Sequence, residues 1–165
     1  MEENAKSAKE LFSVERVFNA PVELVWEAYT TPQYVARWWG PRGAVVIHCT
    51  IDFKVGGRFH YGMKFGGEHE HWNVGEFKEI VPLKKIVAYM WMSNKAGEIV
   101  PPPAELGEDF AEDAPDVTLF ESLPGGKTKI TLVTNHTVES AKKSGMDEGY
   151  KQVLDKLEDV LKSVK

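Results

Sequence analysis

Histidines are the first residues in this sequence whose type and spacing suggest chemistry. His69 and His71 lie two positions apart in an alternating segment, so on a strand they would share one face about 6.6 Å apart. A zinc site needs further ligands at set distances, and His60 on the preceding run is the nearest candidate. We expect these residues to form a polar outer patch, and we predict no bound metal.

Two other segments resemble reactive motifs only in part. Gly125 to Thr128 looks like the end of a phosphate-binding loop, but Glu121 stands where its first glycine is required. Strand-like runs flank the segment on both sides, which predicts a hairpin turn. Cys49 is the single cysteine, lies among alternating apolar residues and is expected to be a small core side chain. We therefore predict no catalytic residue and no cofactor.

Carboxylates that could act as acid or base are hard to select. Asp52 alternates with apolar neighbours and is expected on the opposite face from them. Glu76 precedes Phe77 and is expected to point outward for the same reason. A catalytic acid needs a perturbed carboxyl group within reach of a substrate, and the pattern identifies none.

Aromatic and sulfur-bearing side chains are better suited to line an apolar ligand site. Trp38 and Trp39 stand out, but neighbours on a helix point about 100° apart, so at most one would face a shared cavity. We expect this pair mainly to pack the second of two short helices against the sheet. The predicted lining residues are Trp26, Trp38, Phe59, Tyr61, Met63, Phe77, Tyr89, Trp91 and Tyr150.

The elements that must position these residues can be traced along the chain. Residues 11–18 alternate like a strand, and Pro21 and then Thr31-Pro32 mark the starts of two short helices. Strand-like runs follow from Val45 to His136, and their short connections up to Met92 favour an antiparallel meander.

The C-terminal segment predicts the longest helix. Its apolar residues fall on one stripe at helical spacing: Met146, Tyr150, Val153, Leu154, Leu157, Val160, Leu161 and Val164. The helix could begin after Ser144 as N-cap, or near Glu139 with Gly145 and Gly149 inside it.

These elements predict an α+β domain in which a curved antiparallel sheet of about six strands wraps a long C-terminal helix. A twisted sheet cannot contact a straight helix along its whole length, so we expect an apolar gap beside the helix. Residues 93–115 form a long acidic connection, and a lid over the cavity and a plain surface excursion are equally compatible with it.

Composition supports one soluble domain. The chain has 165 residues, of which 42% are hydrophobic and 27% charged, with a net charge of −5. Basic residues are scattered, so we expect no nucleic-acid partner, and no apolar run approaches the ~18 residues that span a bilayer. We expect a flexible N-terminus over residues 1–10, a single domain over 11–165 and a cytoplasmic location without membrane insertion.

Several segments together resemble one family. Residues 15–21, 25–30 and 36–41, with Gly56 to Phe59 and Gly75 to Ile80, are similar to the SRPBCC (START-like, birch-pollen-allergen-like) superfamily. Within it they resemble the branch named for the C-terminal domain of the heat-shock protein 90 ATPase activator. Residues 145–161 are similar to the terminal helix of that branch, with Tyr150 where tryptophan is common.

The resemblance implies a helix-grip fold with a ligand cavity between sheet and terminal helix. We favour a non-enzymatic binder or carrier of a small apolar or aromatic molecule, in keeping with the lipid-binding and stress-response members of the superfamily. A cyclase-like enzyme using the cavity is an alternative, and a co-chaperone module is a further one. The separate N-terminal domain of the chaperone activator has no counterpart in the roughly eleven residues before the first strand, which disfavours that partner. Exposed sheet edges are compatible with a homodimer.

Overall fold

A computed structural model describes residues 10–40, 42–66, 68–101 and 115–164. Within them, seven strands form one antiparallel sheet in the order β1-β7-β6-β5-β4-β3-β2. The strands are β1 (Leu11–Phe18), β2 (Ala44–Ile51), β3 (Arg58–Phe65), β4 (His69–Val81), β5 (Lys85–Ser93), β6 (Asp116–Leu123) and β7 (Lys127–Thr137). The α+β class and the helix-grip architecture are confirmed, with the sheet one strand larger than about six.

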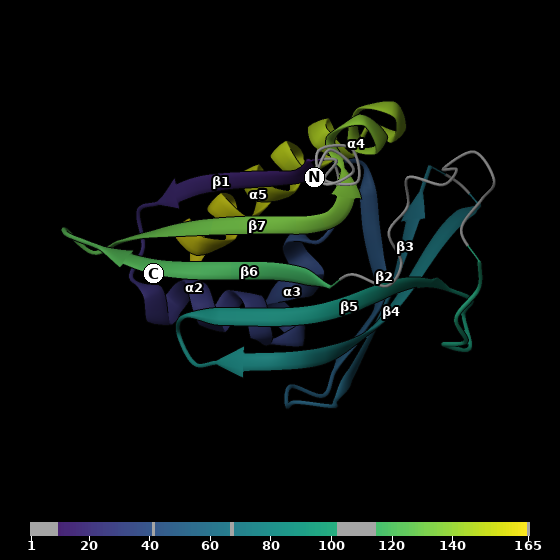
Figure 1. Ribbon diagram of the computed structural model, residues 1–165, viewed down its shortest axis with the longest axis horizontal. Coiled ribbons are helices and arrows are strands. Elements are labelled where there is room, and N and C mark those ends of the chain that lie inside the picture. Colours follow the sequence, from purple (N-terminus) through teal and green to yellow (C-terminus); the bar gives the residue numbers. More distant parts are fainter. Residues whose placement is uncertain (1–9, 41, 67, 102–114, 165) are drawn as a thin grey trace, which may run out of the picture.

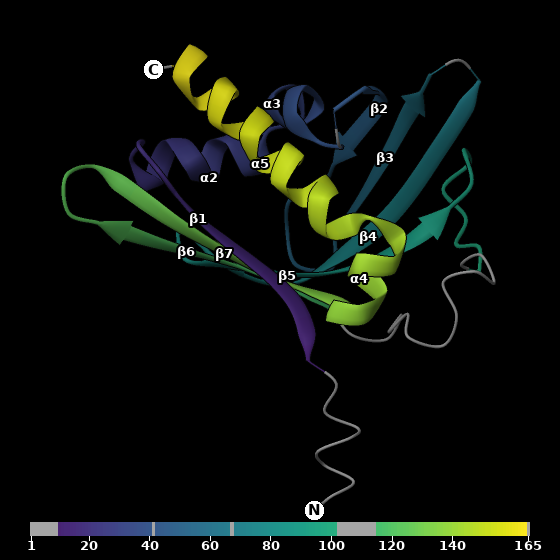
Figure 2. The same cartoon turned by 90° about the horizontal axis from the view of Figure 1, so that it is seen from above.

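Short turns connect most, but not all, of the neighbouring strands in this order. Strands β2 to β5 pair in sequence as a meander, β6 pairs with β5, and β7 closes the other half by pairing with β6 and β1. Register shifts within the β1–β7, β2–β3 and β4–β5 pairs mark irregular positions where an antiparallel sheet bends. Figure 2 shows the resulting curvature, with the helices gathered on one side of the sheet.

Two short helices follow β1, as the proline positions predict. Helix α2 (Val22–Thr30) begins directly after Pro21, and α3 (Pro32–Trp38) carries its proline in the first turn. Their buried residues include Val25 and Val35. Both helices lie beside the C-terminal helix over the same face of the sheet (Figures 1 and 2).

The C-terminal helical segment is broken in two. Helix α4 (Val138–Ser144) starts at Thr137, whose hydroxyl accepts a hydrogen bond from Ser140 N at 3.0 Å, and α5 is Met146–Ser163. Gly145 separates them with φ +82°, a conformation that favours glycine. Helical structure therefore begins close to the earlier predicted start, but Gly145 interrupts it. The long helix itself begins at Met146, close to the later predicted start, with Gly145 and not Ser144 at the N-cap position.

The core lies between the concave sheet face and α5. Phe18, Val25, Ile130 and Leu157 are almost completely inaccessible to solvent. A residue with a Cβ at Gly75 would collide with the Phe59 ring and with the carbonyl oxygen of Tyr89, so glycine is what allows that ring to lie flat on the sheet. None of the described helices has the length and apolar character needed to span a membrane.

Two predicted segments fall largely beyond what the structure describes. Residues 1–9, expected to be flexible, and residues 102–114 of the proposed lid lie outside the described residues. The described start of that connection turns back on β5: Ser93 pairs with Ile99, and Asn94 receives hydrogen bonds from Gly97 and Glu98.

Candidate functional site: a cavity between the sheet and helix α5

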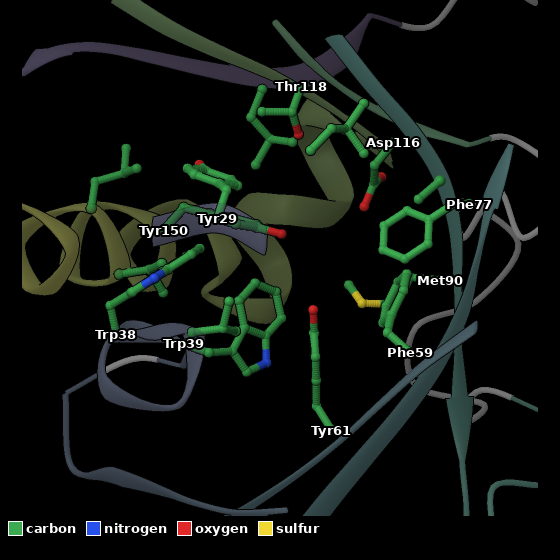
Figure 3. A pocket seen from close by; sticks show the side chains of 16 residues that line it. Tyr29, Trp38, Trp39, Phe59, Tyr61, Phe77, Met90, Asp116, Thr118 and Tyr150 are labelled. Atoms are coloured by element: carbon green, nitrogen blue, oxygen red, sulfur yellow. The ribbon is translucent and has the colours of Figure 1, made fainter. Parts of the chain in front are cut away.

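A cavity of about 100 Å³ lies between the concave sheet face and the first half of α5. Its walls come from α2, α3 and α5 on one side and from strands β3 to β7 on the other (Figure 3). The lining residues are Tyr29, Val35, Trp38, Trp39, Phe59, Tyr61, Phe77, Ile86, Ala88, Met90, Asp116, Thr118, Leu132, Tyr150, Val153 and Leu154. Seven of these sixteen are aromatic, and these rings are the largest side chains in the wall.

Five of the nine residues selected from the sequence line this cavity: Trp38, Phe59, Tyr61, Phe77 and Tyr150. Phe59 and Tyr61 alternate on β3 and stack with ring centroids 5.0 Å apart, while Phe59 contacts Phe77 at 5.1 Å. Tyr150 enters from the first turns of α5. Their role in ligand binding stays a prediction.

Two of the other four residues lie on the wrong face of β5. Ala88 and Met90 point into the cavity, so Tyr89 and Trp91, which alternate with them, point away. The latter two rings stack on each other at 5.5 Å on the outer face. Their aromatic character suggested that they line the cavity, but the alternation of side chains along the strand places them on the outer face of the sheet.

The remaining two residues lie on the helix-covered side but do not line the cavity. Trp26 packs edge-on against Phe53 and Phe120, with centroid distances of 5.7 and 4.9 Å. Met63 is buried on the same face of β3 as Tyr61, but its sulfur lies against Gly40 beyond the cavity. The hydrophobic periodicity of the sequence alone could not distinguish these two positions from positions that line the cavity.

Both tryptophans of the consecutive pair line the cavity, which corrects the expectation that at most one would. The 100° rule does not apply because Trp39 has left the helix, with φ −71° and ψ 143°. Lys156 on α5 donates from Nζ to the carbonyl oxygens of Trp39 and Gly40 at 3.3 and 3.1 Å, which holds this extended segment. Trp38 Nε1 donates to Ala28 O at 3.0 Å.

Three tyrosines give the cavity its phenol groups. Burial raises the pKa of Tyr29, Tyr61 and Tyr150 well above the usual range, so all three are neutral at physiological pH. No hydrogen bond joins their hydroxyl groups to another group in the described part of the chain. Trp39 Nε1 is likewise buried without a hydrogen-bond partner among these residues.

Asp116 is the lining residue that sequence reasoning missed and that matters most chemically. It begins β6, opposite Ala88, and its carboxylate points into the cavity (Figure 3). Its negative charge contributes to the raised pKa of Tyr150, after burial. It follows the long connection, where no alternation assigns a face, so the pattern carried no signal for it.

The other motifs form no site among the described residues. His60 pairs with Val74 and His71 with Met63, so the two histidines lie on opposite faces of the sheet and do not converge. No group of three or more metal-ligating side chains is found in the described ranges. Burial raises the pKa of Cys49 to about 11, which keeps this thiol protonated. The Gly125-Gly126 segment is the β6–β7 hairpin turn, as expected.

Comparison with known families agrees with this geometry. Residues 19–162 match the model of the family described as Activator of Hsp90 ATPase homolog 1-like protein. The chain belongs to this family. The AHSA1-like family is of the SRPBCC type, so the predicted resemblance is confirmed. A search of curated proteins found no match.

Solved structures similar to this AHSA1-like chain come from several bacteria. A protein of Nitrosomonas europaea is 21% identical with a TM-score of 0.72, over 94% of this chain and 96% of that one. A protein of Staphylococcus epidermidis is 22% identical with a TM-score of 0.73, over 94% and 91%. An AHSA1-like protein of Aeromonas hydrophila is 20% identical with a TM-score of 0.61, over 92% and 93%. These likenesses establish the shared fold.

Proposed function

We propose that this AHSA1-like protein binds a small, largely apolar molecule in the cavity under α5 and acts as a binder or carrier. The observation that supports this most is the wall itself: aromatic and aliphatic side chains line a space into which a carboxylate and several phenols project. Small-molecule sites in proteins combine an apolar lining with a few such polar groups.

The cavity's size suits a ligand of about one ring or a short branched chain. A space of about 100 Å³ is of the same order as the engineered ~150 Å³ cavity that takes up benzene. A long acyl chain or a sterol would need the walls to move apart. The proposed ligand class is therefore narrower than the lipids bound elsewhere in the superfamily.

Filling the cavity tests the proposal. Ala88→Leu adds three carbon atoms on the cavity side of β5, and Ala96→Leu makes the same change in an exposed turn. Titration with toluene and benzyl alcohol, followed by amide chemical shifts, should show binding that Ala88→Leu weakens at least tenfold and Ala96→Leu leaves intact. Native mass spectrometry of protein purified from its own host would show a bound small molecule. Absence of any shift at cavity residues would exclude the proposal.

Catalysis in the same cavity is the second candidate, and Asp116 is the observation that favours it. A carboxylate among three neutral phenols could hold or transfer a proton at a bound carbonyl compound. Assay of model esters and cyclisable polyketides would test this. Turnover above background that Asp116→Asn abolishes would support it, and no turnover by protein that binds these compounds would exclude it.

A further inference from the structure

One buried hydrogen-bond donor in the cavity wall is unused. Trp39 lines the cavity, and its Nε1 is buried without a hydrogen-bond partner in the part of the chain that the structure describes. Trp38 beside it offers a comparison, because its Nε1 donates to Ala28 O at 3.0 Å. An indole N–H can donate but cannot accept, so only an acceptor atom can complete the hydrogen bonding of Trp39. Because native proteins rarely leave a buried polar group unpaired, this position indicates a ligand that carries an acceptor.

Tyr61 places a second donor next to the first. Its ring centroid lies 5.3 Å from that of Trp39, and Figure 3 shows the Tyr61 hydroxyl pointing into the cavity. Burial raises the pKa of this phenol well above its usual range, so the hydroxyl keeps its proton at physiological pH and can donate it. The Tyr61 oxygen does not accept from Trp39 Nε1, so the N–H and the O–H both remain available on one wall.

The surroundings of these two donors are aromatic rings. Phe59 stacks on Tyr61 with centroids 5.0 Å apart, and Trp38 contacts Trp39 at 6.1 Å. A hydrocarbon would gain from burial against these rings but would leave the Trp39 donor unpaired, which is unfavourable. A carbonyl oxygen has two lone pairs and no hydrogen of its own, so it can accept from both donors while its body lies against the rings.

We propose that the cavity selects a small neutral carbonyl compound, such as a ketone or lactone, with a body about one ring in size. This inference rests on the proposed ligand-binding function and specifies its ligand class. The carbonyl oxygen accepts hydrogen bonds from Trp39 Nε1 and from the Tyr61 hydroxyl, and the body packs against Phe59 and Trp38.

Two ligands of the same shape test this at the atom concerned. Cyclohexanone and methylenecyclohexane differ only in C=O against C=CH₂, so both present one ring and only the ketone can accept a hydrogen bond. The chain has five tryptophans, each of which gives one indole N–H signal in a proton–nitrogen correlation spectrum. Side-chain assignment identifies the signal of Trp39. We expect cyclohexanone to move this proton downfield, as a new hydrogen bond does, and methylenecyclohexane to cause no downfield shift.

Variants in matched pairs locate the effect. Water hydrates the ketone better than the hydrocarbon, so the ratio of their dissociation constants is compared between proteins. Trp39→Phe and Tyr61→Phe each remove one donor and should raise the ratio of ketone to hydrocarbon by about three- to tenfold. Binding of the hydrocarbon also shows that each variant is folded. Trp91→Phe and Tyr89→Phe make the same changes on the outer face of the sheet and should leave the ratio unchanged.

The outcomes separate this inference from the function on which it rests. A Trp39 indole proton that does not move in the ketone complex, or a ratio that both cavity variants leave unchanged, would overturn the carbonyl inference and leave the ligand-binding function standing. The indole measurement uses the unaltered protein, so it decides the question even if a variant fails to fold. If neither ligand shifts cavity residues, the proposed function itself fails and the inference with it.

Discussion

The two halves of helix α5 bury similar side chains over the same sheet but border different surroundings. Leu157 and Val160 of the second half lie in the apolar core away from this cavity. Tyr150, Val153 and Leu154 of the first half line the cavity. The amphipathic stripe is continuous across both halves, so the helix alone does not determine where the cavity forms.

Polar atoms differ between the two regions as well. In the closed region Thr128 Oγ1 is fully buried and donates to Ala20 O at 2.7 Å, so its hydrogen-bonding capacity is used. At the cavity, Trp39 Nε1 has no partner in the described part of the chain. Buried polar groups in native proteins are nearly always paired, so the cavity side is where a ligand or water would complete the hydrogen bonds. This difference supports the proposal that the cavity takes up a ligand.

Matched leucine truncations should show the largest difference. Leu157→Ala leaves a new void in closed packing and should lower the free energy of unfolding by about 3–5 kcal/mol. Leu154→Ala removes the same atoms from a wall that already borders empty space, so we expect only about 2–3 kcal/mol. Urea denaturation of both variants measures the two values. An equal or larger loss for Leu154→Ala would show that the two halves are equally packed.

Gly75→Ala should destabilise the cavity wall without altering the closed core. The added methyl group must displace the Phe59 ring, and we expect a loss of about 2 kcal/mol in the free energy of unfolding. Adding Phe59→Leu, which removes the colliding ring atoms, should recover part of this loss. Denaturation of the single and double variants provides the test, and a fully additive result would contradict the contact.

Acid should weaken the cavity end first. His136 lies near the end of β7, where burial lowers its pKa to about 4 from the ordinary 6.5. Between these pH values the unfolded chain therefore binds a proton at His136 that the folded chain does not bind. The free energy of unfolding has its full value above about pH 6.5 and falls as the pH is lowered towards 4. Because the ring is only partly buried, we expect a loss of no more than about 2 kcal/mol.

Amide hydrogen exchange at pH 7 and at pH 4.5 would localise this effect. Residues at the end of β7 and in α4 should lose protection before Leu157 does. His136→Gln, which cannot gain the proton, should show a smaller dependence on pH. Uniform loss of protection along the chain would contradict a local origin.

The smallest effect is expected on the solvent side of α5. Arg16 on β1 donates to Asp155 Oδ1 at 2.7 Å, and both side chains are partly exposed. Asp155→Asn should lower the free energy of unfolding by about 0.5–1 kcal/mol, less at high salt. Denaturation at two salt concentrations measures it. A loss that high salt leaves unchanged would show that packing, and not charge, connects β1 to this helix.

The sequence predicted the architecture well because its signals were local. The apolar stripe from Tyr150 to Leu161, the prolines at 21 and 32 and the short glycine turns each depend on neighbouring residues alone. Alternation also placed Phe59, Tyr61 and Phe77 on the correct face.

The cavity was predicted less completely because its composition depends on contacts between distant segments. Both faces of β5 are apolar, so Tyr89 and Ala88 could not be assigned without the neighbouring helices. Asp116 follows an irregular connection, and Trp39 takes an extended backbone that no helical rule describes. These positions became clear only from the three-dimensional arrangement.

The extended backbone at Trp39 also has an optical consequence. Because the peptide turns out of the helix there, two adjacent indoles lie 6.1 Å apart at an angle of 74° on one wall. Two chromophores this close and this strongly tilted couple electronically through their strong short-wavelength transitions, so far-ultraviolet circular dichroism should contain a paired signal from them. Occupancy of the cavity would then be readable from the protein's own spectrum, without any attached label.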